Sequence, residues 1–415
     1  MKRSPKIFCV FGKYNYGDPG RGLGYEYSNF IPALKRLGYE IAFFDNWDRA
    51  LFQNFYELNK ALLYRVKREQ PDIMFSTLIH YEIWRQTLCL LRDSGSVATV
   101  NWATDDSWRY ESFSRLVAPA FHAFTTTDSD AYAKYQRDGI KNVLLTQWAA
   151  NSATLQEPLP AAKCTYAVSF IGSAHGDRPR WIAALRQRGI EIVCFGHGWD
   201  RGPVASEDIP GIIRTSWISL NFANSALSWE SLLPRKSYQI KARVFEVPGA
   251  GGFLLTQWVD GLDRWYIPGQ EICVFHGPDD LAERIRYYLA HPAMRDAIAW
   301  AGFERTRVEH TYDHRLPHVL EFALKCRDAY LAQANAEKRD WSDALQFETI
   351  AKQHRVNILL AILRRATVQA CSHIWGPQRG PRAARRLFFE LSWRLVGART
   401  YTSAGWPGRM FYEVS

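Results

Sequence analysis

Short apolar runs alternate with longer amphipathic stretches through the first two thirds of the chain. The apolar runs are four to six residues long, which is the length of strands buried in a sheet. The stretches between them repeat apolar residues at helical spacing. This alternation predicts an α/β fold in which helices cover parallel sheets.

The runs form two sets, separated by a polar, proline-containing stretch at residues 151–163. Strands of the first set are predicted at Ile7–Phe11, Glu40–Asp45, Asp72–Thr77, Ala98–Trp102, Ala123–Thr126 and Asn142–Leu145. Strands of the second set are predicted at Tyr166–Ile171, Ile190–Phe195, Ile218–Phe222, Gly252–Thr256 and Glu271–Phe275. Helices are predicted at Tyr25–Leu37, Phe55–Glu69, Asp128–Asp138, Arg180–Arg188, Leu281–Leu289, Pro292–His310 and Leu316–Gln333.

The length of 415 residues exceeds what one ordinary core supports. The sequence therefore predicts two Rossmann-like domains, residues 1–160 and 161–335, followed by a basic helical extension at residues 336–415. In that extension the apolar run Val356–Leu363 precedes a break at Gly376–Pro381 and a basic amphipathic segment at Ala383–Val396.

Composition excludes several classes of protein. Hydrophobic residues make up 47% of the chain and charged residues 23%, which excludes disordered, collagen-like and coiled-coil chains. The seven cysteines contain no Cys-x-x-Cys pair, so neither a disulfide framework nor a zinc knuckle is predicted. The apolar run that follows Met1–Pro5 is too short for a signal peptide or a membrane span, and we expect a cytoplasmic protein.

Positive charge is concentrated at the end of the chain. The net charge is +10, and residues 341–415, with 11 Lys or Arg and 4 Asp or Glu, contribute +7 of it. A basic amphipathic segment can rest on an anionic membrane surface, which predicts a peripheral location at the inner face of the membrane. Packing of the segment back across the domains is the favoured alternative, because aromatic residues continue to the end. Basic charge without a recognition module does not predict nucleic-acid binding.

Each set of strands opens with a strand that runs into a glycine-bearing turn. In the first half, Gly20, Gly22 and Gly24 precede Tyr25 at a predicted helix start. Glycines allow a loop to approach a ligand closely, and a helix N-terminus favours anions. The spacing matches neither the dinucleotide fingerprint nor a P-loop; the alternative is a surface loop without a ligand.

The second half opens with Gly172 and Ser173, followed by Arg178 and Arg180. Backbone N–H groups and forked guanidinium donors in this arrangement suit a diphosphate, although a solvated turn would look the same. The next predicted strand ends in Gly196, His197 and Trp199, at an edge where a nucleotide base can lie.

A dense cluster of charge follows at Lys241, Arg243 and Glu246. A predicted helix over Gln239–Val247 places Arg243 and Glu246 one turn apart on one face. A glutamate among cations can accept both hydroxyls of a ribose while the cations neutralise phosphates. The alternative is a surface ion pair that contributes little.

At this point the residues resemble a known family. The segments Phe170–Ser173, Lys241–Glu246, Gly251–Thr256, Gly269–Ile272 and Ala301–Arg305, with His310–Tyr312, are similar to those of the CgeB-like glycosyltransferases, which are related to the glycosyltransferase group 1 enzymes. The resemblance covers about residues 165–315 well. It implies a GT-B fold, with two facing Rossmann-like domains, a nucleoside-diphosphate sugar in the second and an acceptor in the first.

The resemblance also implies roles for individual residues. Glu246 takes the place of the family's ribose-binding glutamate, whereas Tyr238 stands where the family's other motif glutamate lies, so retention or inversion is not inferred. Lys241 or Arg243, with Arg178 or Arg180, would stabilise the departing diphosphate. A GT-B enzyme does this without a bound metal or cofactor.

The acceptor is expected in the first half, at the carboxyl ends of its strands. Candidates there are Gly22, Gly24, Tyr25, His80 and Asp106, with Asp105 as the catalytic base. Capping of the next helix is the alternative for Asp105 and Asp106. Asp128-Ser129-Asp130 matches the Asp-x-Asp metal motif of single-domain sugar transferases, but two sheets argue against that fold.

The sequence thus predicts a metal-independent glycosyltransferase in glycan or glycoconjugate biosynthesis, with a saccharide, lipid-linked or protein acceptor. Two alternatives remain open: a non-catalytic nucleotide- or sugar-binding protein or partner subunit that retains the fold, and a sugar epimerase.

Overall fold

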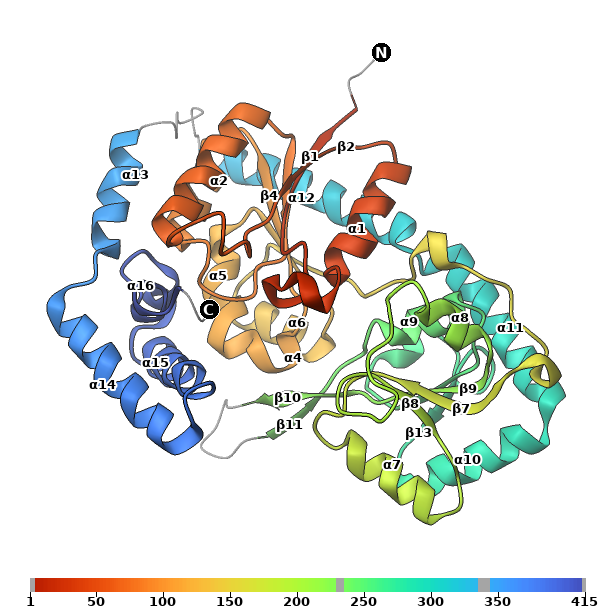
Figure 1. Cartoon of the computed structure of the whole chain (residues 1–415). Helices are drawn as coiled ribbons and strands as arrows, with labels where there is room; N and C mark the ends of the chain where they lie inside the picture. Colours follow the sequence, from red (N-terminus) through yellow and green to blue (C-terminus); the bar gives the residue numbers. More distant parts are fainter. Residues whose placement is uncertain (1–3, 229–234, 335–343, 413–415) are drawn as a thin grey trace. The chain divides into compact units, whose positions relative to one another are not determined.

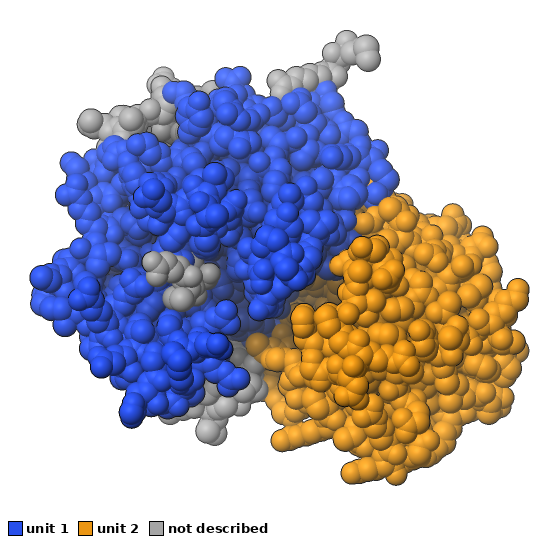
Figure 2. All heavy atoms as spheres, viewed as in Figure 1, with its two compact units in different colours: residues 1–126, 131–145, 318–415 blue, residues 127–130, 146–317 orange. Residues whose placement is uncertain are grey.

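The structure, a computed structural model, describes residues 4–228, 235–334 and 344–412, and divides the chain into two compact units (Figures 1 and 2). Unit 1 comprises residues 1–126, 131–145 and 318–415, and unit 2 comprises residues 127–130 and 146–317. After the short segment 127–130, the chain enters unit 2 again at residue 146, before the expected boundary at 160. It returns at residue 318, before the expected boundary at 335, and the predicted extension groups with unit 1.

Unit 1 is built on a six-stranded parallel sheet in the order β2-β1-β3-β4-β5-β6. Its strands are β1 (Lys6–Val10), β2 (Glu40–Phe44), β3 (Ile73–Ser76), β4 (Ala98–Trp102), β5 (Ala123–Thr126) and β6 (Val143–Leu145). Every residue of β3, β4 and β5 is buried, as expected for central strands covered on both faces.

Helices α1 (Tyr25–Arg36), α2 (Phe55–Glu69), α3 (Arg85–Ser94), α4 (Asp106–Arg109), α5 (Arg115–Val117) and α6 (Ser129–Arg137) occur within this first part of the chain. Local signals set their limits. The Asn54 side chain accepts a hydrogen bond of 3.0 Å from the Glu57 N–H at the start of α2, which satisfies a donor that the helix itself leaves free.

Unit 2 contains a five-stranded parallel sheet in the order β13-β12-β9-β7-β8. Its strands are β7 (Tyr166–Ile171), β8 (Val193–Phe195), β9 (Ser216–Asn221), β12 (Leu254–Gln257) and β13 (Cys273–Phe275). Its helices are α7 (Arg178–Gln187), α8 (Ile209–Arg214), α9 (Arg243–Gly249), α10 (Pro278–Ala290) and α11 (Pro292–Glu309).

Between β9 and α9 the structure contains a hairpin that the apolar pattern does not predict. Strands β10 (Asn224–Ser228) and β11 (Arg235–Tyr238) pair antiparallel. The helix predicted over 239–247 begins only at Arg243, beyond the end of β11 at Tyr238.

The C-terminal part of unit 1 is helical, as predicted. It contains α12 (Tyr312–Ala334), which begins in unit 2, and then α13 (Ala344–Ala351), α14 (Ile358–Trp375), α15 (Gly380–Val396) and α16 (Trp406–Met410). Phe347 and Tyr401 enter the hydrophobic core of unit 1, and Phe347 stacks on Trp84 with ring centroids 6.0 Å apart. This burial explains why the extension belongs to unit 1 and is not a separate body.

Candidate functional site

The strand order of unit 2 has a switch point between β7 and β9, where successive connections leave in opposite directions along the sheet. In open α/β sheets ligands bind at such a point, beyond the carboxyl ends of the strands. The loop after β7 contains Gly172 and Ser173, and the chain after β9 forms the hairpin that leads to α9. The predicted donor residues therefore meet at this edge of unit 2.

The glycines of this edge pack two loops against each other. Gly196 has φ of +129°, and a Cβ there would lie 2.4 Å from the Gly172 carbonyl oxygen. The Gly172 N–H donates to the Phe195 carbonyl at 2.8 Å, and the Trp199 indole N–H donates to the Gly172 carbonyl at 2.7 Å. Gly172, Gly196 and Trp199 thus hold the turn in shape, whereas the predicted contacts with a nucleotide base stay a prediction.

Ser173 and His197, by contrast, are exposed beside this turn. Their backbone carbonyls are engaged: that of His197 accepts from the Ala174 N–H at 2.8 Å, and that of Ser173 accepts from Arg178 Nη1 at 3.1 Å. Both side chains remain able to reach a ligand.

Arg178 is the first residue of α7 and is only partly exposed. Its Nε donates to Asn224 Oδ1 of β10 at 3.3 Å, and its guanidinium lies 5.6 Å from the Phe170 ring centroid. The pKa of Arg178 is lowered, first by burial and then by the positive charge of Arg243. The positive charges of these two arginines thus act on each other, as they do at an anion site.

Arg243 forms an ion pair with Glu246, with Nη1 and Oε2 separated by 2.7 Å, and both side chains are about one fifth exposed. The structure thus brings Arg178, Arg243 and Glu246 together. Lys241 is partly buried two residues before α9, where it has interactions of its own. Arg180 is exposed on α7, and its charge acts on Lys236 of β11.

In unit 1 the corresponding switch point lies between β1 and β3. The glycine loop after β1 is closed by its own hydrogen bonds: the Gly24 N–H donates to the Lys13 carbonyl at 2.8 Å, and the Asn15 N–H donates to the Gly22 carbonyl at 3.1 Å. Gly22 has φ of +76°, and a Cβ added to it would meet nothing within 4 Å. It is an ordered turn with Gly22 open to solvent, and Tyr25 begins α1 behind it.

Glu26, in the first turn of α1, is the functional candidate that sequence reasoning missed. Burial first, and then the negative charge of Asp105, raise the pKa of Glu26 to about 7. Asp105 occupies the cap position before α4, but its side chain makes no capping hydrogen bond, so the capping alternative is not what orients it. The charge of Asp105 thus acts on a carboxylate from a different element at this edge, and that carboxylate titrates near neutral pH, where a general base is most effective.

Asp106 is turned into the core. It is 2% exposed, and its carboxylate accepts hydrogen bonds from the Ser114 hydroxyl and, at 3.0 Å, from the Tyr135 hydroxyl. This position explains Asp106 as a structural residue, and we do not retain it among the acceptor-binding candidates.

His80 follows β3 and is surrounded by arginines. Arg109 Nη2 donates to His80 Nδ1 at 3.3 Å. The pKa of His80 is well below its ordinary value, because of burial and then the charges of Arg109, Arg385 and Arg49. His80 is accordingly neutral at physiological pH, and the positive charge at this site belongs to the arginines.

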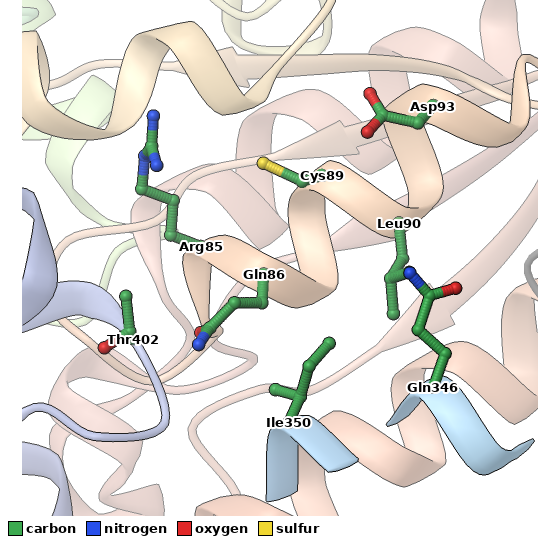
Figure 3. A pocket seen from close by; sticks show the side chains of 8 residues that line it. All are labelled: Arg85, Gln86, Cys89, Leu90, Asp93, Gln346, Ile350 and Thr402. Carbon is green, nitrogen blue, oxygen red and sulfur yellow. The ribbon is translucent and has the colours of Figure 1, made fainter. Parts of the chain in front are cut away.

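A cavity of about 240 Å³ lies in unit 1 between α3 and the C-terminal helices (Figure 3). Arg85, Gln86, Cys89, Leu90, Asp93, Gln346, Ile350 and Thr402 line it. Burial raises the pKa of the Cys89 thiol, which disfavours the nucleophilic thiolate. Gln86 is engaged with Ser403 and Asp93 with the Tyr330 hydroxyl at 2.7 Å, so two of the polar side chains that line the cavity already have partners.

Within residues 4–228, 235–334 and 344–412, no group of three or more His, Cys, Asp or Glu side chains is placed to hold a metal ion. The Asp128-Ser129-Asp130 motif lies within these residues. Independence from metal stays a prediction. In the same part of the chain, no helix has the length and apolar character needed to cross a membrane.

Comparison with known structures defines the fold. Over 80% of this chain and 100% of the other, the structure resembles sucrose-phosphate synthase from Thermosynechococcus elongatus, with a TM-score of 0.52 and 12% identity. Over 79% of this chain and 100% of the other, it resembles Anabaena HepE in complex with UDP-glucose, with a TM-score of 0.51 and 12% identity. The fold is GT-B, as the sequence predicts.

The sequence comparison is more local. Residues 178–321 match the family model described as glycosyl transferase-like, which includes Arg178, Arg243 and Glu246 and spans about a third of the chain. No curated protein matches the chain. The family signal is thus that of a glycosyltransferase, and the CgeB-like subgroup stays a prediction.

Proposed function

We propose that this protein is a glycosyltransferase that moves a sugar from a nucleoside-diphosphate sugar to an acceptor hydroxyl in glycan or glycoconjugate biosynthesis. One observation carries the proposal: Arg178, Arg243 and Glu246 converge at the switch point of unit 2, inside the glycosyl transferase-like segment.

The main task in this chemistry is to stabilise the charge that develops on the departing diphosphate. Arg178 is preorganised for it, because Asn224 and the Ser173 carbonyl fix its guanidinium. Arg243 adds a second cation, and its bond to Glu246 keeps the carboxylate beside the phosphates, where it can accept the ribose hydroxyls. Because the side chains of Arg178 and Arg243 supply the positive charge beside the diphosphate, we propose that the reaction proceeds without a bound metal.

On the acceptor side we propose that Glu26 and Asp105 act as a pair. One of the two takes the proton of the acceptor hydroxyl, since a base must lie within hydrogen-bond reach of that proton. Burial first, and then the charge of Asp105, raise the pKa of Glu26 to about 7, so Glu26 can both accept and release a proton near neutral pH.

We also propose that the α14–α15 pair contacts an anionic membrane surface. Between Lys352 and Arg399 the chain contains ten Lys or Arg and one acidic residue, Glu390. Large apolar side chains on these helices are exposed, namely Ile358, Leu359, Ile362, Leu363, Ile374, Trp375, Leu387, Leu391 and Leu395. An exposed apolar face beside strong positive charge suits a bilayer of anionic lipids, while Ala384 and Phe388 of α15 pack with Cys371 of α14 and with Met410 and Phe411.

The decisive experiment measures the shift of melting temperature by UDP, GDP, ADP, CMP and dTDP, with and without a divalent metal. A ligand that binds only the folded state raises this temperature. UDP is tested first, because a protein of the same fold was solved with UDP-glucose. We expect stabilisation by one diphosphate, independent of metal, and its loss in Glu246→Ala.

A matched control is Glu304→Ala, which removes the carboxylate of a similar pair, Arg307 with Glu304, at 2.6 Å in the same unit. If both variants still bind the nucleotide, Glu246 serves only its ion pair. If no diphosphate shifts the wild-type protein at millimolar concentration, the transferase proposal fails. The non-catalytic alternative, which Tyr238 in place of a motif glutamate favours, would then replace it.

A further inference from the structure

Three arginines from separate segments of unit 1 converge on His80, at the carboxyl end of β3. Arg109 of α4 is 4% exposed and donates to His80 Nδ1 at 3.3 Å. Arg49, after β2, lies 5.9 Å from the ring centroid of Trp47, and that ring lies 6.3 Å from the His80 ring.

The third arginine, Arg385, comes from α15 of the C-terminal extension. Its charge acts on both His80 and Tyr81. Phe389, one turn further along α15, contacts the same two rings, at centroid distances of 6.4 and 6.2 Å. The extension therefore supplies part of this cluster.

The cluster lacks the anion that buried cations normally require. Among the described residues, none of Arg49, Arg109 and Arg385 forms an ion pair, and the Nε of each is buried without a hydrogen-bond partner. The Arg49 Nη1 donates to the Asn46 carbonyl at 2.9 Å, and Arg109 otherwise contacts the rings of Trp108 and Phe113 at 5.3 and 5.0 Å.

Glu82 is a buried carboxylate whose charge acts on Arg109, but it does not fill that place. Glu82 accepts from the backbone N–H of Ile79 at 3.2 Å and from that of His80 at 3.0 Å, and from Asn46 Nδ2 at 3.3 Å. These donors fix Glu82 in the turn after β3. His80 is neutral and adds no charge, which leaves three guanidinium groups without a counter-ion in direct contact.

We propose that Arg49, Arg109 and Arg385 form a binding site for a phosphate group of the acceptor. The assignment of this phosphate to the acceptor rests on the proposed function. The anion site itself does not depend on that function. Guanidinium forks match phosphate oxygens, and the site lies at the sheet edge where Asp105 and Glu26 are placed. The C-terminal extension would then select the acceptor through Arg385.

The test is the phosphate-dependent melting temperature of the full-length protein in an Arg243→Gln background, which weakens binding of phosphate in unit 2. Sodium chloride at equal ionic strength is the reference. We expect inorganic phosphate to raise the melting temperature. The concentration for half the effect should increase at least tenfold on Arg385→Gln or Arg49→Gln. Arg386→Gln, an exposed neighbour on the same helix, should leave it unchanged.

The proposal is overturned if phosphate gives no shift beyond chloride, or if Arg385→Gln and Arg386→Gln behave alike. Titration of UDP into the Arg385→Gln protein with Arg243 intact separates this result from the donor site: we expect unchanged UDP affinity. If no nucleoside diphosphate binds the wild-type protein, the proposed function fails, and the phosphate result still stands.

Vesicles identify the source of the phosphate. Binding to phosphatidic acid over phosphatidylcholine vesicles that Arg385→Gln weakens and Arg386→Gln does not would assign a lipid phosphate. A shift by inorganic phosphate without such vesicle binding would assign a soluble phosphorylated acceptor. Both results support the site.

Discussion

The sheets of units 1 and 2 have the same strand order around their switch points, yet the two points differ in chemistry. In each sheet the second strand lies outside the first, and the third, fourth and fifth follow on the other side. In unit 2 the switch point holds an ion pair, Arg243 with Glu246, and a second arginine. In unit 1 it holds arginines without acidic partners among the described residues and a neutral histidine.

The strand order of a sheet sets where its switch point lies, whereas segments outside the sheet set which side chains stand at that point. In unit 2 the hairpin β10–β11 supplies Asn224, which orients Arg178. In unit 1 the C-terminal helices supply Arg385 and cover His80 through Phe389. Neither addition belongs to the shared sheet, so two sheets of one type have switch points with different charges.

The largest expected effect is on UDP affinity, when the two arginines at the switch point of unit 2 are replaced. Arg178→Gln with Arg243→Gln removes two charge-assisted contacts, each worth about 1.5–3 kcal/mol, so UDP affinity should fall at least about 100-fold. Uridine, which lacks the diphosphate, should be unaffected at these positions. Isothermal titration of both ligands checks the expectation.

Arg180→Gln is the matched control for that double variant, because Arg180 is exposed two residues from Arg178. An unchanged UDP affinity assigns the phosphate contact to Arg178. If Arg180→Gln weakens UDP as much as the double variant does, the convergence of Arg178 and Arg243 is not the donor site.

In unit 1, the pH dependence of stability tests the raised pKa of Glu26. The pKa of Glu26 is about 7 in the folded protein and about 4.3 when unperturbed, so the folded state binds more protons between these values. The free energy of unfolding should therefore fall as pH rises from about 4.5 to 7, by up to about 3 kcal/mol from this group. Glu26→Gln should remove that slope in urea unfolding.

Asp105→Asn should have an intermediate effect in the same urea unfolding measurement. Because the Asp105 charge adds to the effect of burial on Glu26, its removal should lower the pKa of Glu26 and reduce the slope without abolishing it. If neither variant changes the slope of unfolding free energy against pH, the charge of Asp105 does not act on Glu26.

Much of the fold follows from the sequence, because buried parallel strands are short apolar runs. All eleven predicted strands overlap observed ones, and Ala98–Trp102, Ala123–Thr126 and Tyr166–Ile171 agree to the residue. The hairpin is missed because Asn224–Ser228 and Arg235–Tyr238 mix polar and apolar residues. Docking of the extension is set by contacts distant in sequence, such as Phe347 with Trp84.

The candidate site was predictable only where its residues follow one another in the chain. Arg243 and Glu246 are three residues apart, so helical spacing pairs them. Glu26 lies in the first turn of α1 and Asp105 precedes α4, much further along the chain, so only the fold lets the charge of one act on the other. Asp106 and Asp105 are neighbours in sequence, but Asp106 points to the Tyr135 hydroxyl in the core, which the pattern of charges does not reveal.

A smaller effect separates packing from ligand binding at the unit 2 turn. Gly196→Ala would place a Cβ 2.4 Å from the Gly172 carbonyl oxygen in a backbone conformation of φ +129°, at a cost of about 2 kcal/mol. Gly189→Ala is the control, with φ of +74° and nothing within 4 Å, and should cost about 1 kcal/mol. Equal losses in thermal unfolding would mean that the two loops are not in contact.

The smallest expected effect tests the apolar face that distinguishes unit 1 from unit 2. Leu387, Leu391 and Leu395 form one stripe along α15 and are 47%, 45% and 68% exposed. Burial in a bilayer would remove this area from water, and replacing all three by Ser should weaken binding to anionic vesicles about tenfold, or about 1.4 kcal/mol. Co-sedimentation measures it, with Leu51→Ser, an exposed leucine outside the C-terminal helices, as the control. Because the basic residues remain in the triple variant, high salt should weaken the vesicle binding of both the wild type and the triple variant. Vesicle binding that salt abolishes and the triple variant leaves unchanged would mean that charge alone attracts this surface, and the apolar stripe would then need another partner.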